Sequence, residues 1–137
     1  MLFISPPFGN YLSFDNCISI KGSYTLEPRP GLIVQILKTL RYDFEKGAWI
    51  NKIGLRNRGV DYGIENYNSK NEVLSVAVLN PEDIEKLVEK IPNNTNLEIN
   101  VSCPNAGKKM IDQNIDKFLG PSRKWCILKL SPLVTKE

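Results

Sequence analysis

The sequence predicts an α/β fold in which parallel strands alternate with helices. Strand-like apolar runs alternate along the chain with segments of helical spacing, and strands joined in this way run parallel. The run from Glu72 to Leu79 is rich in Val and Leu and alternates little, which is typical of a strand buried on both faces. The run from Asn96 to Val101 alternates instead, and Pro104 ends the strand just past Cys103.

The chain has the size and composition of a single globular domain. It has 137 residues, of which 42% are hydrophobic and 24% charged, and its net charge is +3. No stretch is long and apolar enough to span a membrane, and the opening segment lacks the basic start of a secretory signal. We therefore expect a cytoplasmic protein with no membrane partner. The basic pairs are short and scattered, so we expect no nucleic-acid partner either.

The remaining elements follow from apolar spacing and from residues that start or stop helices. Asn80 fits an N-cap and Pro81 the first helical position, and acidic residues follow in the first turn. Gly120 and Pro121 end the helix before the last strand. In chain order, we expect strands at 2–4, 17–20, 72–79, 96–101 and 125–130, and helices at 32–40, 62–67, 81–91 and 111–119.

The three cysteines, Cys17, Cys103 and Cys126, lack Cys-x-x-Cys spacing, so the sequence indicates neither a disulfide framework nor a metal site. Cys17 and Cys126 lie in apolar runs, and we expect both to be buried packing residues. The chain has no histidine. Any proton abstraction by this chain must therefore use another group.

Polar side chains share one face of the strand that leads to Cys103. Glu98, Asn100 and Ser102 alternate with apolar residues, and the spacing is compatible with two structures. In a two-faced sheet these groups would form the solvent-exposed side. In a parallel barrel they would lie at the carboxyl-terminal mouth, where active sites are found.

Four stretches, in this order along the chain, form a further pattern. They are Thr25-Leu-Glu-Pro-Arg-Pro-Gly31, the run from Ile50 to Gly59, the run from Glu98 to Asn105 that contains Asn-Val-Ser-Cys-Pro-Asn, and Ile127-Leu-Lys-Leu-Ser-Pro132. Together they resemble the class 1 dihydroorotate dehydrogenases, which are flavoproteins of pyrimidine biosynthesis. The resemblance implies a partial (β/α)8 TIM barrel, roughly the first half, because a full barrel needs about 200 residues or more. The implied reaction is oxidation of dihydroorotate to orotate with hydride transfer to FMN.

The same resemblance implies roles for individual residues. Cys103 matches the catalytic base, and a class 2 enzyme would have serine there. A loop thiol suits this role when nearby donors favour its thiolate. Paired amides suit the carbonyl, N–H and carboxylate edge of orotate. The implied substrate-binding residues are Asn51, Gly54, Leu55, Asn100 and Asn105, and the implied cofactor-binding residues are Lys129, Asn100, Lys21 and Ser23.

Several of these positions also fit a purely structural explanation. Asn51 and Asn105 fit turns, and Lys129 fits a solvent-facing position on an edge strand. The family lysine usually lies three residues before Thr25, where this chain has Gly22, so Lys21 matches only after a shift of one residue. Residues 32–40 resemble an insertion, because this connection is usually shorter in the family.

The matched stretches belong to the first half of a barrel, so we interpret residues 1–137 as the N-terminal part of an FMN barrel domain. The phosphate of the flavin is usually held by the second half. We therefore expect either a homodimer or another chain that supplies the missing half-barrel. Two alternatives are a non-catalytic half-barrel or partner subunit, and a protein similar to the tRNA dihydrouridine synthases, which have a different pattern before their Cys-Pro.

Overall fold

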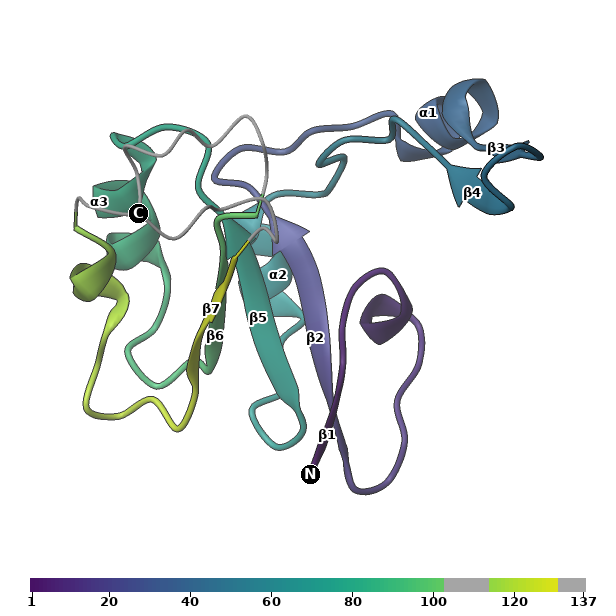
Figure 1. Ribbon diagram of the computed structural model, residues 1–137. Helices are drawn as coiled ribbons and strands as arrows, with labels where there is room; N and C mark the ends of the chain where they lie inside the picture. The colour runs from purple at the N-terminus through teal and green to yellow at the C-terminus, as the bar shows by residue number, and fades with distance from the viewer. Residues whose placement is uncertain (103–113, 131–137) are drawn as a thin grey trace, which may run out of the picture.

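Five parallel strands form the central sheet of the protein, in the order β1-β2-β5-β6-β7 (Figure 1). The computed structural model describes residues 1–102 and 114–130. The sheet strands are β1 (Leu2–Ile4), β2 (Cys17–Tyr24), β5 (Glu72–Ala77), β6 (Leu97–Asn100) and β7 (Cys126–Lys129). All four strand pairings are parallel. This half-barrel sheet, with helices between its strands, confirms the predicted α/β fold and is consistent with a partial TIM barrel.

Helical segments connect the strands of the sheet. They are η1 (Phe8–Asn10) after β1, α2 (Val60–Glu65) before β5, α3 (Asp83–Lys90) between β5 and β6, and η3 (Ile115–Phe118) before β7. Among the helices in the described ranges, none is long and apolar enough to cross a bilayer.

The hydrophobic core lies between one face of the sheet and the helices α2 and α3. Its sheet side consists of alternate residues of β5 and β6, and its helix side consists of the inner residues of α2 and α3. The central members, all 2% exposed or less, are Val60, Leu74, Val76, Ile84, Leu87, Leu97 and Ile99. The opposite face, which we call the concave face, carries Glu98 and Asn100 of β6 and, from β5, Ser75 between the apolar residues Val73 and Ala77.

A separate segment projects from the carboxyl-terminal edge of the sheet between β2 and α2 (Figure 1, upper right). It contains α1 (Leu32–Thr39) and an antiparallel hairpin of β3 (Arg41–Asp43) and β4 (Ala48–Ile50). We call residues 30–56 the excursion. Its two ends are joined just outside it, where Arg29 and Asn57 exchange backbone hydrogen bonds of 2.8 and 2.9 Å. The helix was predicted from its spacing, whereas the hairpin was not predicted.

Two helix boundaries differ from the predictions. α2 begins two residues earlier than expected, at Val60, directly after Gly59, which adopts a positive φ of 85°. The prediction that Asn80 is the N-cap of α3 is wrong, because the helix begins at Asp83. The Asp83 N–H donates to the Asn80 carbonyl at 3.0 Å, and the Asp83 carboxylate accepts from the Asn80 N–H at 3.2 Å. These bonds form a separate turn ahead of the helix.

The helix predicted at 111–119 is described only in part. Residues 115–118 form a 3-10 turn, and residues 111–113 lie outside the described ranges. The prediction of two buried cysteines is also wrong. Cys126 is exposed because it lies on β7, an outermost strand of the described sheet, and Cys17 is half-buried at the start of β2, next to the other outermost strand, β1.

Candidate active site

Three of the predicted site residues lie at the carboxyl-terminal ends of adjacent or near-adjacent strands. Ser23 is the penultimate residue of β2, and Asn100 and Lys129 are the last residues of β6 and β7. Asn100 and Lys129 are direct partners in the parallel register. Parallel strands bring their carboxyl ends to one edge of the sheet, and in barrels this edge carries the active site.

A chain of hydrogen bonds crosses the concave face from β6 through β5 to β2 and back. The Ser75 hydroxyl donates to Glu98 Oε1 at 2.7 Å, and the hydroxyl oxygens of Ser23 and Ser75 lie 2.7 Å apart. Asn100 Nδ2 donates to Ser23 Oγ at 2.8 Å. Glu98 is only 3% exposed and Asn100 only 7% exposed. The polar face of β6 is therefore buried, which is incompatible with a solvent-exposed side of a two-faced sheet.

The direction of these hydrogen bonds fixes the orientation of the Asn100 amide. Ser75 has one hydroxyl hydrogen and gives it to the Glu98 carboxylate, so Ser23 must donate to Ser75. Ser23 then accepts from the NH₂ group of Asn100, which leaves Asn100 Oδ1 on the other side. This oxygen accepts from the Ser102 backbone N–H at 3.1 Å and from the Ser102 hydroxyl at 2.6 Å. Within residues 1–102 and 114–130, the second N–H of the Asn100 amide has no acceptor.

Lys129 brings a positive charge to the same edge of the sheet. Lys129 is half-buried, and within the described ranges no ion pair joins it to an acidic side chain. A half-buried cation is costly unless a partner stabilises it. Lys129 beside the Asn100 donor therefore fits an electron-rich ring or a carboxylate as a ligand.

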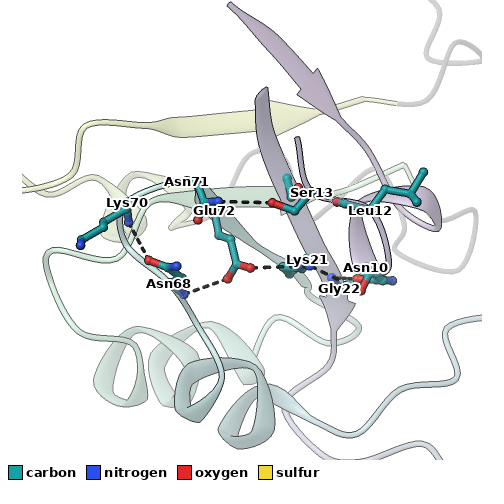
Figure 2. Close-up of polar contacts among 10 residues, drawn as sticks. Asn10, Leu12, Ser13, Lys21, Gly22, Asn68, Lys70, Asn71 and Glu72 are labelled. Atoms are coloured by element: carbon teal, nitrogen blue, oxygen red, sulfur yellow. Dashed lines mark hydrogen bonds and ion pairs between the residues drawn. The ribbon is translucent and has the colours of Figure 1, made fainter. Parts of the chain in front are cut away.

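Lys21 does not join this cluster. The pairing of β2 with β5 shifts register between Lys21 and Tyr24, and Lys21 aligns with Leu74, whose side chain belongs to the core face. Lys21 and Ser23 consequently point to opposite faces of the sheet. Figure 2 shows Lys21 beside Glu72, with Nζ 3.6 Å from the carboxylate.

The network around Lys21 holds the loop after β1 against β2. The Asn10 side chain accepts from the Gly22 N–H at 2.7 Å and donates to the Gly22 carbonyl at 2.8 Å (Figure 2). Lys21 Nζ donates to the Asn10 carbonyl at 3.4 Å. Glu72 also accepts from the Asn68 N–H at 2.8 Å. These contacts give Lys21 a structural role on the outer side of the sheet.

Asn51, Gly54 and Leu55 lie in the excursion, after β4. Asn51 is exposed, and its Oδ1 accepts from the Ile53 N–H at 3.2 Å, which is the geometry of an Asx turn. Gly54 has a positive φ of 67° and allows the following bend. In the described ranges, no hydrogen bond or ion pair connects these three residues to the cluster of Ser23, Asn100 and Lys129.

Cys103 and Asn105 lie outside the described residues. The segment that leads to them starts from a fixed point, because Ser102 makes two hydrogen bonds to Asn100. Their predicted roles as catalytic base and substrate-binding residue therefore stay predictions.

Ser75 and Asn57 organise the site and were not predicted as part of it. Ser75 completes the buried hydrogen-bond chain with Glu98, which was expected with Asn100 at the mouth of a barrel, and a lone serine inside the apolar run of β5 was the available signal for it. Asn57 holds the base of the excursion: its Oδ1 accepts from the N–H groups of Thr25 and Gly59 at 3.1 and 2.8 Å. Asparagine is common in loops, so no sequence signal distinguishes Asn57 from the others.

Comparison with known proteins gives a consistent family assignment. A family model described as dihydroorotate dehydrogenase matches residues 10–119. A putative dihydroorotate dehydrogenase A (fumarate) of Streptococcus agalactiae is 33% identical, over 72% of this chain and 42% of the relative. The catalytic subunit of dihydroorotate dehydrogenase B (NAD(+)) of Desulforamulus reducens is 33% identical, over 66% of this chain and 31% of the relative. No solved structure matches.

The chain spans less than half the length of these curated relatives. The family model nevertheless covers most of the chain, and the strands of the sheet are parallel, as predicted. This chain therefore belongs to the dihydroorotate dehydrogenase family.

Proposed function

We propose that residues 1–137 are the N-terminal part of an FMN barrel domain that oxidises dihydroorotate to orotate in the de novo synthesis of pyrimidine nucleotides. The observation that carries the proposal is the buried chain from Glu98 through Ser75 and Ser23 to Asn100, which ends beside Lys129. It presents an oriented amide donor and a cation at the strand ends where barrel enzymes bind their substrates.

The reaction forms a carbon–carbon double bond by removing a proton and a hydride from neighbouring carbons. FMN, when bound, supplies the acceptor for the hydride. The Cys103 thiolate is the general base that accepts the proton, and it must lie near the carbon that loses this proton. Asn51, Asn100 and Asn105 contribute substrate contacts, with Gly54 and Leu55 beside Asn51, and the second N–H of Asn100 is the donor left available by its fixed orientation.

The residues present on the concave face suit the ring of a flavin. Lys129 and Asn100 offer a cation and an N–H donor, and the cation favours negative charge on a reduced ring. Ser23 acts through Asn100, whose amide it orients. We leave Lys21 out of the set, because its side chain pairs with Glu72 on the other face of the sheet.

The missing contacts define the partner that we propose. Phosphate groups are usually held by backbone N–H groups and a helix N-terminus, which in barrels come after the last strands. Either a second copy or another chain that supplies these strands would complete the domain, and a cytoplasmic location suits this function.

The proposal is tested on this chain co-expressed with the carboxyl-terminal part of a longer relative. Cys103→Ser should slow the reduction of bound flavin by dihydroorotate at neutral pH at least about a hundredfold, because a general base contributes that much and a hydroxyl is a far weaker base. The measurement is stopped-flow bleaching of flavin absorbance, with Cys126→Ser as the matched control. Equal rates for Cys103→Ser and the parent would contradict the proposal, and a purified complex without flavin would favour a non-catalytic half-barrel.

A further inference from the structure

The Ser23 hydroxyl reaches the Asn100 cluster because β2 has one residue more than β5 at this point. The register shift between the two strands leaves two residues of β2, Gly22 and Ser23, opposite a single residue of β5, Ser75. A β-bulge of this kind re-aims a side chain of the bulged strand. Here Ser23 Oγ lies 2.7 Å from Ser75 Oγ and 2.8 Å from Asn100 Nδ2. The position of the bulge therefore decides where the acceptor for the Asn100 amide lies.

On the side of β5, the bulge packs closely against strand backbone. Gly22 has a positive φ of 123°, and a Cβ at this position would lie 2.4 Å from the Ser75 carbonyl oxygen. Any larger residue would have to displace this backbone, so the bulge requires glycine.

On its other side, the bulge is bound by a side chain in the place of a strand. In the described part of the chain, the last pair between β1 and β2 is Ile4 with Ser19, three residues before Gly22. Asn10 Oδ1 accepts from the Gly22 N–H at 2.7 Å, and Asn10 Nδ2 donates to the Gly22 carbonyl at 2.8 Å (Figure 2). The Asn10 amide thereby satisfies both backbone groups that a neighbouring strand would otherwise satisfy.

The turn that carries Asn10 is itself held against the sheet. Asn10 is the last residue of η1, and its backbone N–H donates to the Pro7 carbonyl at 3.1 Å. η1 lies directly on strand backbone, because a Cβ on Gly9 would be 2.2 Å from the Ile4 carbonyl oxygen. Lys21 Nζ also donates to the Asn10 carbonyl, at 3.4 Å. The amide of Asn10 therefore meets Gly22 from a rigid support.

We propose that Asn10 is a positioning residue for the proposed reaction. By holding the Gly22 backbone it sets the position of the Ser23 hydroxyl, which accepts the hydrogen bond that orients the Asn100 amide. Within the described ranges, the side chain of Asn10 bonds only to Gly22, so it acts on Asn100 through the bulge. This inference rests on the proposed function, because it concerns the orientation of a proposed substrate and flavin contact.

A purely structural role for Asn10 would be to hold the loop after β1 in place. Other hydrogen bonds share that task without touching the bulge. The Ser19 hydroxyl donates to the Leu12 carbonyl at 2.8 Å, and Asn71 Nδ2 donates to the Ser13 hydroxyl at 3.3 Å. Ser19→Ala therefore loosens the same loop while Gly22 stays bound, and it is the matched control.

The test uses this chain with isotope-labelled asparagine, co-expressed with the carboxyl-terminal half-barrel of a longer relative. NMR measures how fast the Asn100 side-chain N–H that binds Ser23 exchanges with solvent, and loss of the signal in Asn100→Asp identifies it. Asn10→Ala should accelerate this exchange about fivefold or more, which is the factor that one ordinary hydrogen bond contributes. Ser19→Ala should leave the exchange rate unaltered.

Two further variants separate positioning from general loosening of the fold. Asn10→Asp keeps the size of the side chain, should Asn10→Ala not fold, and it can no longer donate to the Gly22 carbonyl, so it should also accelerate the exchange. Ser23→Ala removes the acceptor itself. In that background Asn10→Ala should have no further effect, whereas a structural role would add its effect in both backgrounds.

Equal exchange rates in the parent and both Asn10 variants would overturn the proposal, and so would an equal acceleration by Ser19→Ala. The exchange is measured without dihydroorotate, so its outcome is separate from that of the reaction. A parent complex whose flavin is not bleached by dihydroorotate would contradict the proposed function and leave the exchange result standing. In an active complex, Asn10→Ala should slow flavin reduction about fivefold as well.

Discussion

At the scale of single residues, the site depends on how one buried carboxylate orients neutral groups around it. Glu98 accepts a hydrogen bond from Ser75. The direction of this bond determines the direction of the bond between Ser75 and Ser23, and thereby the orientation of the Asn100 amide. Asn100 and Lys129 could be predicted as site residues from the Asn-Val-Ser-Cys-Pro-Asn and Ile-Leu-Lys-Leu-Ser patterns. The direction of the hydrogen bonds could not be predicted from the sequence, because it is set by the hydroxyl of Ser75 on a neighbouring strand.

Lys129 is expected to bind the flavin through its charge. Lys129→Ala should weaken FMN binding by about tenfold to a hundredfold in the complex with a carboxyl-terminal half-barrel, because it removes one charge-assisted contact. Fluorescence titration measures the change. Lys124→Ala removes the charge of an exposed lysine just before β7 and should leave the affinity unaltered. Equal affinities for the two variants would favour a solvent-facing Lys129.

Tyr24 should make the fold sensitive to alkaline pH. Burial raises its pKa above the usual value of 10.0, the neighbouring Tyr62 adds to this, and Arg58 acts in the opposite direction. A raised pKa means that the folded state holds the proton more tightly than the unfolded state. The stabilising contribution is therefore fully present below about pH 10 and is lost as the pH rises through the folded-state pKa.

Urea unfolding between pH 8 and pH 11, about the range of tyrosine titration, measures this effect. The midpoint should fall less steeply with pH for Tyr24→Phe than for the parent. Tyr42→Phe is the control, since Tyr42 is exposed and is not among the groups that shift the pKa of Tyr24. Parallel pH profiles for Tyr24→Phe and the parent would show that Tyr24 is not responsible.

At the scale of elements, strands were predicted better than helix ends and insertions. β1, β5 and β7 lie where apolar runs predicted them, because burial on a sheet leaves a strong local pattern. β2 extends four residues past its predicted end, and its irregularity at Gly22 reverses the face on which Lys21 lies. Such a register shift depends on pairing with β5, so it could not be predicted from the spacing between Lys21 and Thr25 in the sequence. The β3–β4 hairpin has exposed aromatics on short strands and lacks the buried alternation that predicts a strand.

The turn η1 should tolerate no side chain at Gly9. A Cβ at this position would lie 2.2 Å from the Ile4 carbonyl oxygen and 2.4 Å from the Ile20 carbonyl oxygen, and both belong to backbone of the sheet. Gly9→Ala should therefore destabilise the fold by about 2 kcal/mol or more, because strand backbone must shift. Chemical unfolding measures the loss. Gly120→Ala, whose nearest contact would be 3.4 Å, should change stability by less than about 1 kcal/mol. Similar losses for both variants would contradict the close packing of η1.

At the scale of the whole molecule, the sheet has two open edges. In the described part of the chain, β1 pairs only with β2 and β7 only with β6, so each leaves one row of backbone groups unpaired. Unpaired edges promote association with other strands. We expect the purified chain to self-associate in sedimentation experiments at micromolar concentration, and co-expression with a carboxyl-terminal half-barrel should suppress this. A monomer that stays soluble alone would show that the edges are protected by another means.

The isolated chain is also expected to bind FMN weakly. Its proposed contacts to the ring are at Asn100 and Lys129, whereas barrels usually hold a phosphate with the loops after their last strands. Several charge-assisted hydrogen bonds of about 1.5 to 3 kcal/mol each are then missing. Titration of the 137-residue chain should give a dissociation constant well above micromolar. A sub-micromolar value with bleaching by dihydroorotate would mean that this chain builds a complete site.

The bridge between Arg29 and Asn57 closes the excursion at its base, so that the excursion is a structural unit separate from the sheet. Because the two backbones exchange hydrogen bonds of 2.8 and 2.9 Å at this point, the chain leaves the sheet and returns to it at nearly the same place. The register of β2 against β5 is set elsewhere, so residues inserted or deleted between 30 and 56 add only the slowly growing cost of a longer loop. The part of this segment that precedes the proposed substrate contact Asn51 can therefore change in length or sequence among related barrels, while the strand ends that surround Asn100 stay unaltered.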